Sequence, residues 1–457
     1  MAIGQQVTQL FSIDAISNFY YSTGKEWIGA YTLWGRGFLD IMHIIFNNIF
    51  YFFLFITVVV SALFYIMTIY SVFSKKKNEK EKDFIPEKAP FVTIQIPTYN
   101  ELAALNCASR ALNFDYPKDR YEIMIGDDSN KPEISQKIND FAAQHDLVRV
   151  IKREKNVGFK PGNLSNMLKY SKGEFFVLFD SDFLPEKDFL RRIIAPFQYD
   201  PELSVVQSRW KIIKPNTNLI TILGATMSKA FHFLVMPFVK DYGKISFLCG
   251  SGEAIRREHL VDAGGWTSGC LTEDIECSIR LLTKGRKLTY LEDLECECEV
   301  PYTSTDLYKQ QMRWAYGVIH AVKTHFKRIM FSKVDFRKKF AIFTFCSGYV
   351  LSLLIMLLFI FGTLSFITHA PGPVDLSRFL GEFVRNVVLT SGLLVASIFA
   401  VFKDKDIKRI DKVIASSLSY GLVVTLFVNI GIFKVLANQP MKWYMLGKKG
   451  NESSSSE

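Results

Sequence analysis

Two aspartates separated by one residue, Asp180 and Asp182, end an apolar run that begins at Phe175. The run has no helical spacing, which is typical of a strand that is buried on both faces. In an open α/β sheet, ligands bind just outside the carboxyl ends of the strands. Carboxylate oxygens at such a point suit Mg²⁺ or Mn²⁺, which leave coordination positions for the phosphates of a substrate. We therefore predict a metal–diphosphate site, with a solvated turn as the alternative for this motif alone.

Two further polar motifs follow strands that are expected earlier in the chain. Thr98 and Tyr99 come after the first strand, where the hydroxyl can bond to a nucleotide base and the ring can stack on it. Asp127 and Asp128 come after the second strand, and their carboxylates can accept hydrogen bonds from a base N–H group and from ribose hydroxyls. Taken alone, each motif is more often an ordinary turn, so only the combination favours a nucleotide site.

The segment 158–163, Gly-Phe-Lys-Pro-Gly-Asn, combines glycines with a cation. Glycine permits the close approach of a backbone, and Lys160 can neutralise a diphosphate as a point charge. Later in the chain, Asp274 ends the motif Leu-Thr-Glu-Asp, and a carboxylate in a partly enclosed pocket can take the proton from an attacking hydroxyl. Alternatively, Glu273 and Asp274 stabilise the start of a helix that has Thr272 as its N-cap, and both roles can hold together.

A basic and aromatic stretch, 307–330, contains the motif Gln-Gln-Met-Arg-Trp at 310–314. Trp314 offers a flat face for a sugar ring, and Arg313 offers a planar cation for a diphosphate leaving group. Apolar residues alternate with lysines and arginines along the stretch, which predicts an amphipathic helix at the surface of a bilayer. An ordinary surface helix of the preceding domain is the alternative interpretation.

The composition indicates a membrane protein with a cytosolic domain. The 457 residues include 40 phenylalanines, and the mean hydropathy of +0.13 is high for a soluble enzyme. The formal net charge of +10 fits a cytoplasmic membrane face, and no signature of nucleic-acid binding accompanies it. The 7 cysteines form no disulfide framework, and only Cys296 and Cys298 lie close together. Strand alternation places this pair on one face, where packing is favoured over a weak metal site.

Hydropathy and charge divide the chain into segments of different character. The N-terminal segment lacks the features of a signal peptide, and the lysines of the linker that follows the first apolar helix mark the cytoplasmic side. The expected division is an N-terminal segment 1–43, a transmembrane helix 44–73, a basic linker 74–89, an α/β domain 90–304, amphipathic interface helices 305–336, about three transmembrane helices within 337–440 (Phe340–Phe366, Val384–Phe402 and Val413–Val435) and a low-complexity, disordered tail 441–457.

The α/β domain contains short strand-like runs that alternate with helical stretches, and no apolar run of membrane length. The expected strands are Phe91–Ile96, Tyr121–Ile125, Leu147–Ile151, Phe175–Phe179 and Ser204–Gln207. Such spacing is typical of βαβ units, and it predicts a mostly parallel sheet with helices on both faces. A domain of this length can carry its own core, and we expect it in the cytosol.

Seven motifs occur together in a fixed order: Pro-Thr-Tyr-Asn, Asp-Asp-Ser, Gly-x-Lys-x-Gly-Asn, Asp-Ser-Asp, Cys-Gly-Ser, Thr-Glu-Asp and Gln-x-x-Arg-Trp. In this order they resemble the membrane family-2 glycosyltransferases, which include cellulose, hyaluronan and glucomannan synthases. The resemblance extends from about Val92 to Met330, and the flanking apolar segments match the layout of the family. The phrases at 206–210, 299–302 and 310–314 resemble the mannan and glucomannan branch in particular.

The resemblance implies a GT-A nucleotide-sugar fold embedded between transmembrane helices, inversion at the anomeric carbon, and Mg²⁺ or Mn²⁺ as cofactor. By position in the motifs, Asp274 is similar to the general base, and Asp180 and Asp182 are similar to the residues that hold the metal. The residues similar to nucleotide-sugar ligands are Thr98, Tyr99, Glu101, Asp127, Asp128, Lys160, Asp180, Ser181 and Asp182. The residues similar to those that shape the acceptor and diphosphate site are Cys249, Gly250, Ser251, Glu273, Gln310, Arg313 and Trp314.

The activity that the resemblance implies is that of a processive, inverting β-glycosyltransferase. Such an enzyme adds sugars from a UDP- or GDP-sugar to a growing polysaccharide and exports the product through a channel between transmembrane helices. The mannan-like phrases favour GDP-mannose, while UDP-glucose and UDP-GlcNAc stay open. One alternative is a single transfer to a membrane lipid of the ceramide or polyprenol type, because ceramide glucosyltransferase resembles the same motif set. Another is a transporter or scaffold that only senses a nucleotide, against which the acidic cluster argues.

One departure from the family pattern lies near the end of the chain. Many of the synthases end in a gating segment of the type Phe-x-Val-Thr-x-Lys, and the nearest counterpart here, Trp443–Lys448, lacks the threonine. Four crossings would place Trp443 on the outer face, away from a nucleotide. Either one apolar segment is interfacial or re-entrant, or the similarity of this segment is chance. Four crossings are also few for a polymer channel, which leaves an oligomer or a short product open.

Overall fold

The computed structural model describes residues 33–74, 83–369, 375–404 and 410–448. The described residues form two compact units, which we call the helical unit (those within Met1–Ile66 and Val350–Val395) and the sheet unit (those within Met67–Tyr349 and Ala396–Glu457). Three expectations fall on residues outside the described ranges. They concern most of the N-terminal segment, most of the basic linker and the end of the tail, at 1–32, 75–82 and 449–457.

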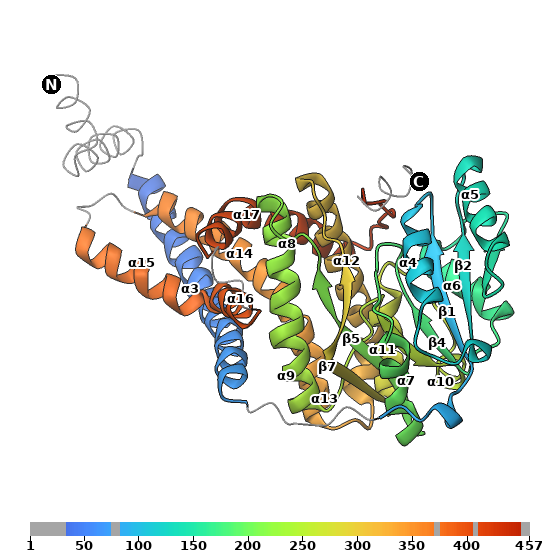
Figure 1. Cartoon of the computed structure of the whole chain (residues 1–457). Helices are drawn as coiled ribbons and strands as arrows, with labels where there is room; N and C mark the ends of the chain where they lie inside the picture. Colours follow the sequence, from blue (N-terminus) through green and yellow to red (C-terminus); the bar gives the residue numbers. More distant parts are fainter. Residues whose placement is uncertain (1–32, 75–82, 370–374, 405–409, 449–457) are drawn as a thin grey trace, which may run out of the picture. The chain divides into compact units, whose positions relative to one another are not determined.

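The sheet unit is built on a seven-stranded sheet in the order β3-β2-β1-β4-β6-β5-β7 (Figure 1). The strands are β1 Val92–Thr98, β2 Tyr121–Asp127, β3 Val148–Lys152, β4 Phe175–Leu178, β5 Leu203–Ile212, β6 Glu253–Arg256 and β7 Lys287–Cys298. Neighbours are parallel except at β6, which runs antiparallel to both β4 and β5. The predicted mostly parallel α/β sheet is confirmed. Strands β1 to β5 were expected, whereas β6 and β7 were missed.

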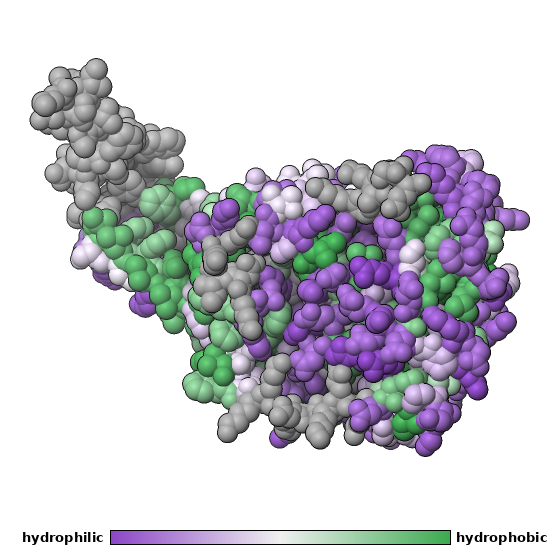
Figure 2. Space-filling model, viewed as in Figure 1, coloured by the Kyte–Doolittle hydropathy of each residue, from purple (hydrophilic) through white to green (hydrophobic). Residues whose placement is uncertain are grey.

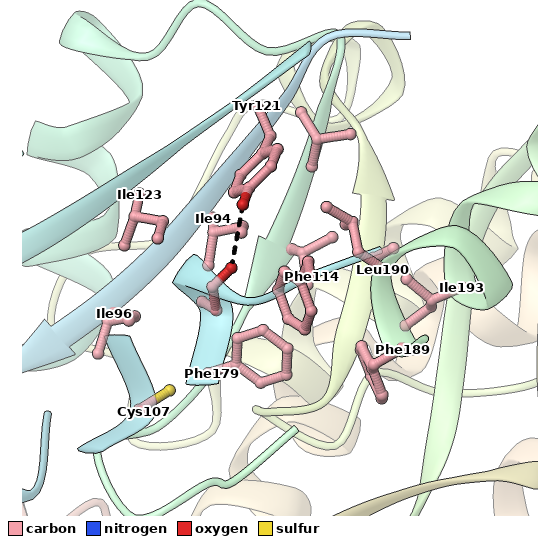
Figure 3. Packing of buried hydrophobic residues seen from close by; sticks show 14 of the residues in the cluster. Ile94, Ile96, Cys107, Phe114, Tyr121, Ile123, Phe179, Phe189, Leu190 and Ile193 are labelled. Carbon is pink, nitrogen blue, oxygen red and sulfur yellow. Dashed lines mark hydrogen bonds between the residues drawn. The ribbon is translucent and has the colours of Figure 1, made fainter. Parts of the chain in front are cut away.

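The core of the sheet unit explains why these strands form. Every residue of β1, β2 and β4 is buried, including the polar side chains of Thr93 and Glu122, which are joined by a hydrogen bond of 2.8 Å. Figure 3 shows Ile94, Phe114, Tyr121, Phe179 and Phe189 gathered in one cluster between the strands and the helices that cover them. Burying a side chain of this size stabilises the fold by roughly 2 kcal/mol. This packing fixes the strands so that the carboxyl ends of β1, β2 and β4 meet at one edge.

Helices cover both faces of the sheet. Helices α4 and α7 contribute to the core cluster, while the buried side chains of α6 pack against β1 and β2 outside that cluster. The helix expected at 307–330 is confirmed as α12. The helices of this unit are α4 Ala103–Leu112, α5 Pro132–Ala143, α6 Phe159–Tyr170, α7 Phe189–Tyr199, α8 Leu219–Ala230, the π-helix η3 Phe231–Val235, α9 Met236–Gly243, α10 Arg257–Asp262, α11 Glu273–Thr283, α12 Ser304–Phe331, α13 Phe336–Phe345 and α17 Ile410–Leu436.

The helical unit contains most of α3 (Leu33–Phe73) and α14 (Ser347–Thr368) and all of α15 (Leu376–Thr390). Its helices make polar contacts: the Tyr65 hydroxyl donates to the Val388 carbonyl at 2.6 Å. Many large apolar side chains of α3 and α15 are exposed, and apolar residues gather over these helices in Figure 2. Exposed apolar surface on this scale indicates contact with lipid.

Four described helices are long and apolar enough to cross a membrane: Gly37–Phe73, Leu219–Gly243, Ser347–Thr368 and Ile410–Leu436. The helix Leu219–Gly243 was not expected, because we predicted no apolar run of membrane length within 90–304. In this helix, which joins α8, η3 and α9, 72% of the apolar window is buried. Its apolar side chains are therefore explained by packing inside the sheet unit.

Two predicted spans have different bounds in the structure. The span expected at Val384–Phe402 is wrong as a single helix. It is divided between α15 and α16 (Gly392–Lys403), which are bent by 56° at Ser391. Gly392, the first residue after the break, lies so close to Ser61 that a Cβ on Gly392 would overlap Ser61. The span expected at Phe340–Phe366 begins only at the start of α14, because its first residues belong to the separate helix α13.

Candidate functional site

Asp180 and Asp182 lie in the turn that follows β4, at the edge where the parallel strands end. The Asp180 N–H donates to the Ser251 hydroxyl at 2.8 Å, which fixes the turn against the loop before β6. The Asp180 carboxylate lies 2.8 Å from the Lys160 ammonium, and the Asp182 carboxylate lies 2.8 Å from the Lys448 ammonium. The two aspartates predicted to hold a metal are thus each paired with a lysine.

Lys160 lies in the first turn of α6 and joins three parts of the site. Gly158 precedes this helix with a positive φ of 76°, which glycine adopts without strain. The Lys160 ammonium pairs with Glu273 at 3.1 Å, in addition to Asp180, and donates to the Gly250 carbonyl at 2.6 Å. Burial alone would lower the pKa of Lys160, but the two carboxylates raise it above its ordinary value. Lys160 therefore stays charged, as the sequence predicted for a diphosphate ligand.

A second cluster lies between the ends of β1 and β4. The Thr98 hydroxyl donates to the Glu101 carbonyl at 3.0 Å, which closes the turn after β1. The Glu101 carboxylate accepts hydrogen bonds from the Ser181 hydroxyl and from the Lys448 ammonium, the latter at 3.0 Å. The same ammonium lies 2.7 Å from the Ser181 hydroxyl. Of the predicted ligands near β1, Glu101 is therefore joined directly to the aspartate turn, and the half-buried Tyr99 lies beside it in the same loop.

Asp274 lies in the first turn of α11, which begins at Glu273. Burial and the Glu273 carboxylate raise the pKa of Asp274 to about 7, against the opposing effect of Lys160. A carboxyl group with this pKa can accept a proton near neutral pH. Thr272 occupies the N-cap position, as predicted, but its hydroxyl makes no capping hydrogen bond and has no partner among the described residues. The prediction of a side-chain cap was therefore wrong.

The α12 helix brings Arg313 and Trp314 to the same region. Gly317 faces Thr272 so closely that a Cβ on this residue would overlap it, so the glycine permits α12 to approach α11. Burial lowers the pKa of Arg313, opposed by Glu273 and other nearby acids. The Trp314 ring lies 6.5 Å from the Trp210 ring, measured between centroids. Gln310, also on α12, is half-buried, and its amide oxygen lies 3.5 Å from the Gln311 side chain.

A segment near the end of the chain, Trp443–Lys448, contacts the candidate site, where a count of four crossings would not have placed it. The Trp443 ring stacks on the Phe159 ring, with 5.8 Å between the centroids. The Arg313 guanidinium lies 4.1 Å from the centroid of the Trp443 ring, in a cation–π contact. Tyr444 donates to Asp306 of α12 at 3.1 Å. This C-terminal segment, residues 443–448, therefore lies against α6, α12 and the aspartate turn rather than on a distant face.

Asp127 and Asp128 lie at the end of β2, but their carboxylates have partners within the protein. Asp127 is fully buried and accepts hydrogen bonds from the Ser129 N–H at 2.9 Å and the Ser135 hydroxyl at 2.5 Å. Asp128 forms a bidentate ion pair with Arg153, whose Nε and Nη2 each lie 2.6 Å from a carboxylate oxygen. These contacts shape the turn after β2. No contact joins either aspartate to Lys160 or Lys448 in the described residues.

The loop before β6 holds the predicted residues Cys249, Gly250 and Ser251. The Ser251 carbonyl accepts from the Trp210 indole at 3.0 Å and from the Gln207 amide at 3.0 Å. Gly250 has a φ of +90°, and a Cβ there would lie 3.3 Å from an Asp274 oxygen. The loop is thus held between β5 on one side and the candidate base on the other.

The residues present fit a divalent cation that takes part of its coordination from phosphates. The described residues include no group of three or more His, Cys, Asp or Glu side chains arranged to hold an ion. Asp180 and Asp182 offer two carboxylates, each of which is paired with a lysine in this structure. Mg²⁺ is commonly bound by one or two carboxylates together with substrate phosphates and water. Cys296 and Cys298 are free thiols buried in the core, which agrees with packing.

Comparison with known proteins shows the family and the fold of the chain. Residues 89–317 match the model of a family described as glycosyltransferase like family 2. The chain is similar to glucomannan 4-beta-mannosyltransferase 2 of Arabidopsis thaliana, with 32% identity over 290 residues (59% of this chain and 54% of that protein). It is similar to probable glucomannan 4-beta-mannosyltransferase 15 of Arabidopsis thaliana, with 28% identity over 279 residues (59% and 52%). The chain spans about half the length of these curated relatives.

Among solved structures, the chain resembles the mannosyltransferase PcManGT from Pyrobaculum calidifontis, determined in complex with GDP-Man and Mn²⁺. The TM-score is 0.58 at 17% sequence identity, and the match covers 88% of this chain and 100% of that one. At this level of identity the likeness concerns the fold. It supports the GT-A-like α/β sheet with flanking apolar helices.

Proposed function

Because the chain belongs to the glycosyltransferase-like family 2, we propose that it transfers a sugar from a nucleotide-sugar donor to an acceptor hydroxyl, with inversion at the anomeric carbon. One observation carries this proposal: Lys160 bridges Asp180 and Glu273, and Asp274 is the next residue of α11. Two groups thus lie together at the edge of the sheet: a cation that can bind a diphosphate and a carboxyl group that can take a proton from a hydroxyl.

In the proposed reaction, the Asp274 carboxylate takes the proton from the acceptor hydroxyl. The hydroxyl oxygen forms a bond to the anomeric carbon, and the bond from that carbon to the diphosphate breaks, leaving its electron pair on the nucleoside diphosphate. Lys160 and Arg313 stabilise the negative charge that develops there. A bound Mg²⁺ or Mn²⁺ on Asp180 and Asp182 would offset further charge on the diphosphate. Trp314 offers an aromatic face for the acceptor sugar.

We propose GDP-mannose as the favoured donor and a β-linked glycan as the acceptor. The two plant relatives are named as glucomannan 4-beta-mannosyltransferases, and the structural neighbour was solved with GDP-Man. UDP-sugars are the competing donors. Repeated transfer to a growing polysaccharide, coupled to export, is part of the proposal. A single transfer to a membrane lipid is the alternative, because the same chemistry serves both acceptors.

A donor panel tests the proposal. The purified full-length protein in nanodiscs is incubated with radiolabelled UDP- or GDP-sugars and Mg²⁺ or Mn²⁺, and the products are digested with glycan-specific hydrolases. We expect a long mannanase-sensitive product from GDP-mannose. One labelled sugar on an extractable lipid would instead establish the alternative. The variant Asp274→Asn is the control, and unaltered turnover in this variant would contradict the proposed base.

We also propose that the sheet unit lies on the cytosolic face of the membrane and that α17 lies along the membrane surface. Both ends of α17 contact other helices of the sheet unit, to which α17 itself belongs. Val413 packs with Ile222 of α8, and the Val435 carbonyl accepts from Lys323 of α12 at 2.8 Å. The outward face carries a stripe of exposed apolar residues at helical spacing, which suits an in-plane helix. These residues are Leu418, Leu422, Leu426, Ile430, Phe433 and Leu436.

An in-plane α17 removes the conflict between four crossings and the position of the C-terminal segment. Lys412→Cys and Gln439→Cys place single thiols near the two ends of α17, at exposed positions. We expect a membrane-impermeant maleimide to label both variants from the same side of oriented vesicles. Labelling from opposite sides would show that α17 crosses. The unchanged protein, with its native cysteines, gives the background.

A further inference from the structure

Glu253 is a buried acid at the first position of β6, outside every motif discussed above. Its neighbours across the sheet are Leu178 at the end of β4 and Gln207 of β5. The residue is fully buried. Because β6 is antiparallel to its neighbours, its first residue lies at the edge where β4 ends. Glu253 is therefore close to the candidate site although it precedes a strand.

One carboxyl oxygen of Glu253 holds the loop that enters the site. Its Oε2 accepts hydrogen bonds from the Cys249 N–H and the Gly250 N–H, both at 2.9 Å. With its N–H directed at Glu253, Gly250 presents its carbonyl to the Lys160 ammonium at 2.6 Å. A chain of contacts thus runs from Glu253 through the peptide backbone to the lysine that bridges Asp180 and the start of α11.

The second carboxyl oxygen, Oε1, is buried and has no hydrogen-bond partner among the described residues. An ionised oxygen in such a place is unfavourable, whereas a protonated one is less so. Burial and the Asp274 carboxylate raise the pKa of Glu253 to about 8, although Lys160 and the two N–H groups act in the opposite direction. The charged or titratable groups that interact electrostatically with Glu253 come from α6, α11 and the loop before β6. They are Lys160, Asp274, Cys277 and Cys249.

We propose that Glu253 is a positioning residue of the site: as a neutral acid it holds the Cys249–Gly250 turn and thereby directs the Gly250 carbonyl to Lys160. This proposal deepens the proposed function, because it assumes that Lys160 faces a diphosphate and that Asp274 is the base. Neutrality matters as well as shape. A second buried negative charge beside Asp274 would repel the diphosphate of the donor.

The variant Glu253→Gln separates charge from shape, because glutamine keeps an acceptor oxygen at nearly the same place and stays neutral at every pH. In the unchanged protein, Glu253 ionises as the pH rises through about 8. We therefore expect the KM for the donor to rise about tenfold between pH 7 and pH 9. In Glu253→Gln, we expect KM to stay within about twofold over the same range, with kcat at pH 7 preserved. Identical KM profiles in the two proteins would overturn the proposal.

The variant Glu253→Ala removes the carboxylate that accepts the Cys249 and Gly250 N–H hydrogen bonds, so it tests whether Glu253 holds this turn. We expect kcat at pH 7 to fall about 100-fold, because the Gly250 N–H loses its partner and Lys160 is displaced. Thermal unfolding checks that the variant folds, and Glu253→Gln decides the question if it does not. Glu258→Gln, at an exposed acid on α10, is the matched control. Full kcat in a folded Glu253→Ala would also overturn the proposal. Failure of the proposed function itself is distinguishable, because Asp274→Asn would then retain turnover.

Discussion

Asp180 and Asp182 are separated by one residue, yet they are paired with lysines of different origin. Lys160 belongs to α6, which packs on the sheet, and it also contacts Glu273 and a loop carbonyl. Lys448 belongs to a segment without regular secondary structure after α17. The positive charge beside the first carboxylate is therefore carried by a helix that packs on the sheet. The charge beside the second comes from a segment that is neither helix nor strand.

The largest expected effect concerns Lys160, the lysine on α6. Lys160→Met should lower kcat/KM about 1,000-fold, because the diphosphate loses a cation and the carboxylates of Asp180 and Glu273 lose their partner. Steady-state kinetics with the preferred donor measures this loss. Lys155→Met, at an exposed lysine just before α6, is the control and should change kcat/KM less than twofold. Equal losses in Lys160→Met and Lys448→Met would end the distinction between the two lysines.

Metal binding without donor should respond to the other lysine. Lys448→Met frees the carboxylates of Asp182 and Glu101 from an internal cation, so we expect about tenfold tighter binding of Mn²⁺. Titration followed by the electron paramagnetic resonance of free Mn²⁺ gives the dissociation constant. Lys442→Met, at an exposed position just before the segment, should leave that constant unchanged. Weaker binding in Lys448→Met would show that the lysine supports the metal instead of competing with it.

The pH dependence of turnover should separate the lysines again. Asp274 must be deprotonated to act, and its pKa is raised to about 7, so turnover should fall about tenfold for each pH unit below that value. Lys160 lowers the pKa of Asp274, so removing this cation should move the acidic limb to higher pH by about one unit. Lys448→Met should leave the acidic limb of the pH profile at the same pH. Residual turnover of both variants, measured from pH 5 to 9, checks the difference.

The smallest effect is expected from the aromatic contact that holds the C-terminal segment. Trp443→Ala removes the ring between Phe159 and Arg313 and should reduce kcat about threefold, because the segment is also held by Tyr444 and Lys448. Trp443→Phe should restore most of the rate. A loss as large as that of Lys160→Met would mean that the segment is as integral to the site as α6.

The half of the site that lies on the sheet could be predicted from the sequence, because the carboxyl ends of parallel strands meet at one edge. This rule places Asp180 and the loop of Lys160 at the same edge of the sheet before any coordinates are known. It does not show which acids stay available. Asp127 and Asp128 fit the same rule, but Ser135 and Arg153 occupy them. Such partners are selected by side-chain packing, which local sequence does not specify.

The other half of the site depends on how α17 lies, and hydropathy cannot decide that. A helix buried against protein, one in the membrane surface and one across the membrane have similar composition, as Leu219–Gly243 also shows. The position of Lys448 could therefore not be deduced. Among the strands, β7 has a readable alternation of buried and less buried residues, of which the sequence prediction used only the end at Cys296 and Cys298. The four residues of β6 include Glu253 and Arg256, and so short a polar run carries no strand signal.

The reversed direction of β6 matters for redesign of the enzyme. In a purely parallel sheet, only residues that follow strands reach the working edge, and changing them means rebuilding loops. Here the opening position of a strand reaches that edge too, on a backbone fixed by hydrogen bonds to β4 and β5. Substitutions at this position can alter the electrostatics beneath the candidate site while the loops around that site stay as they are.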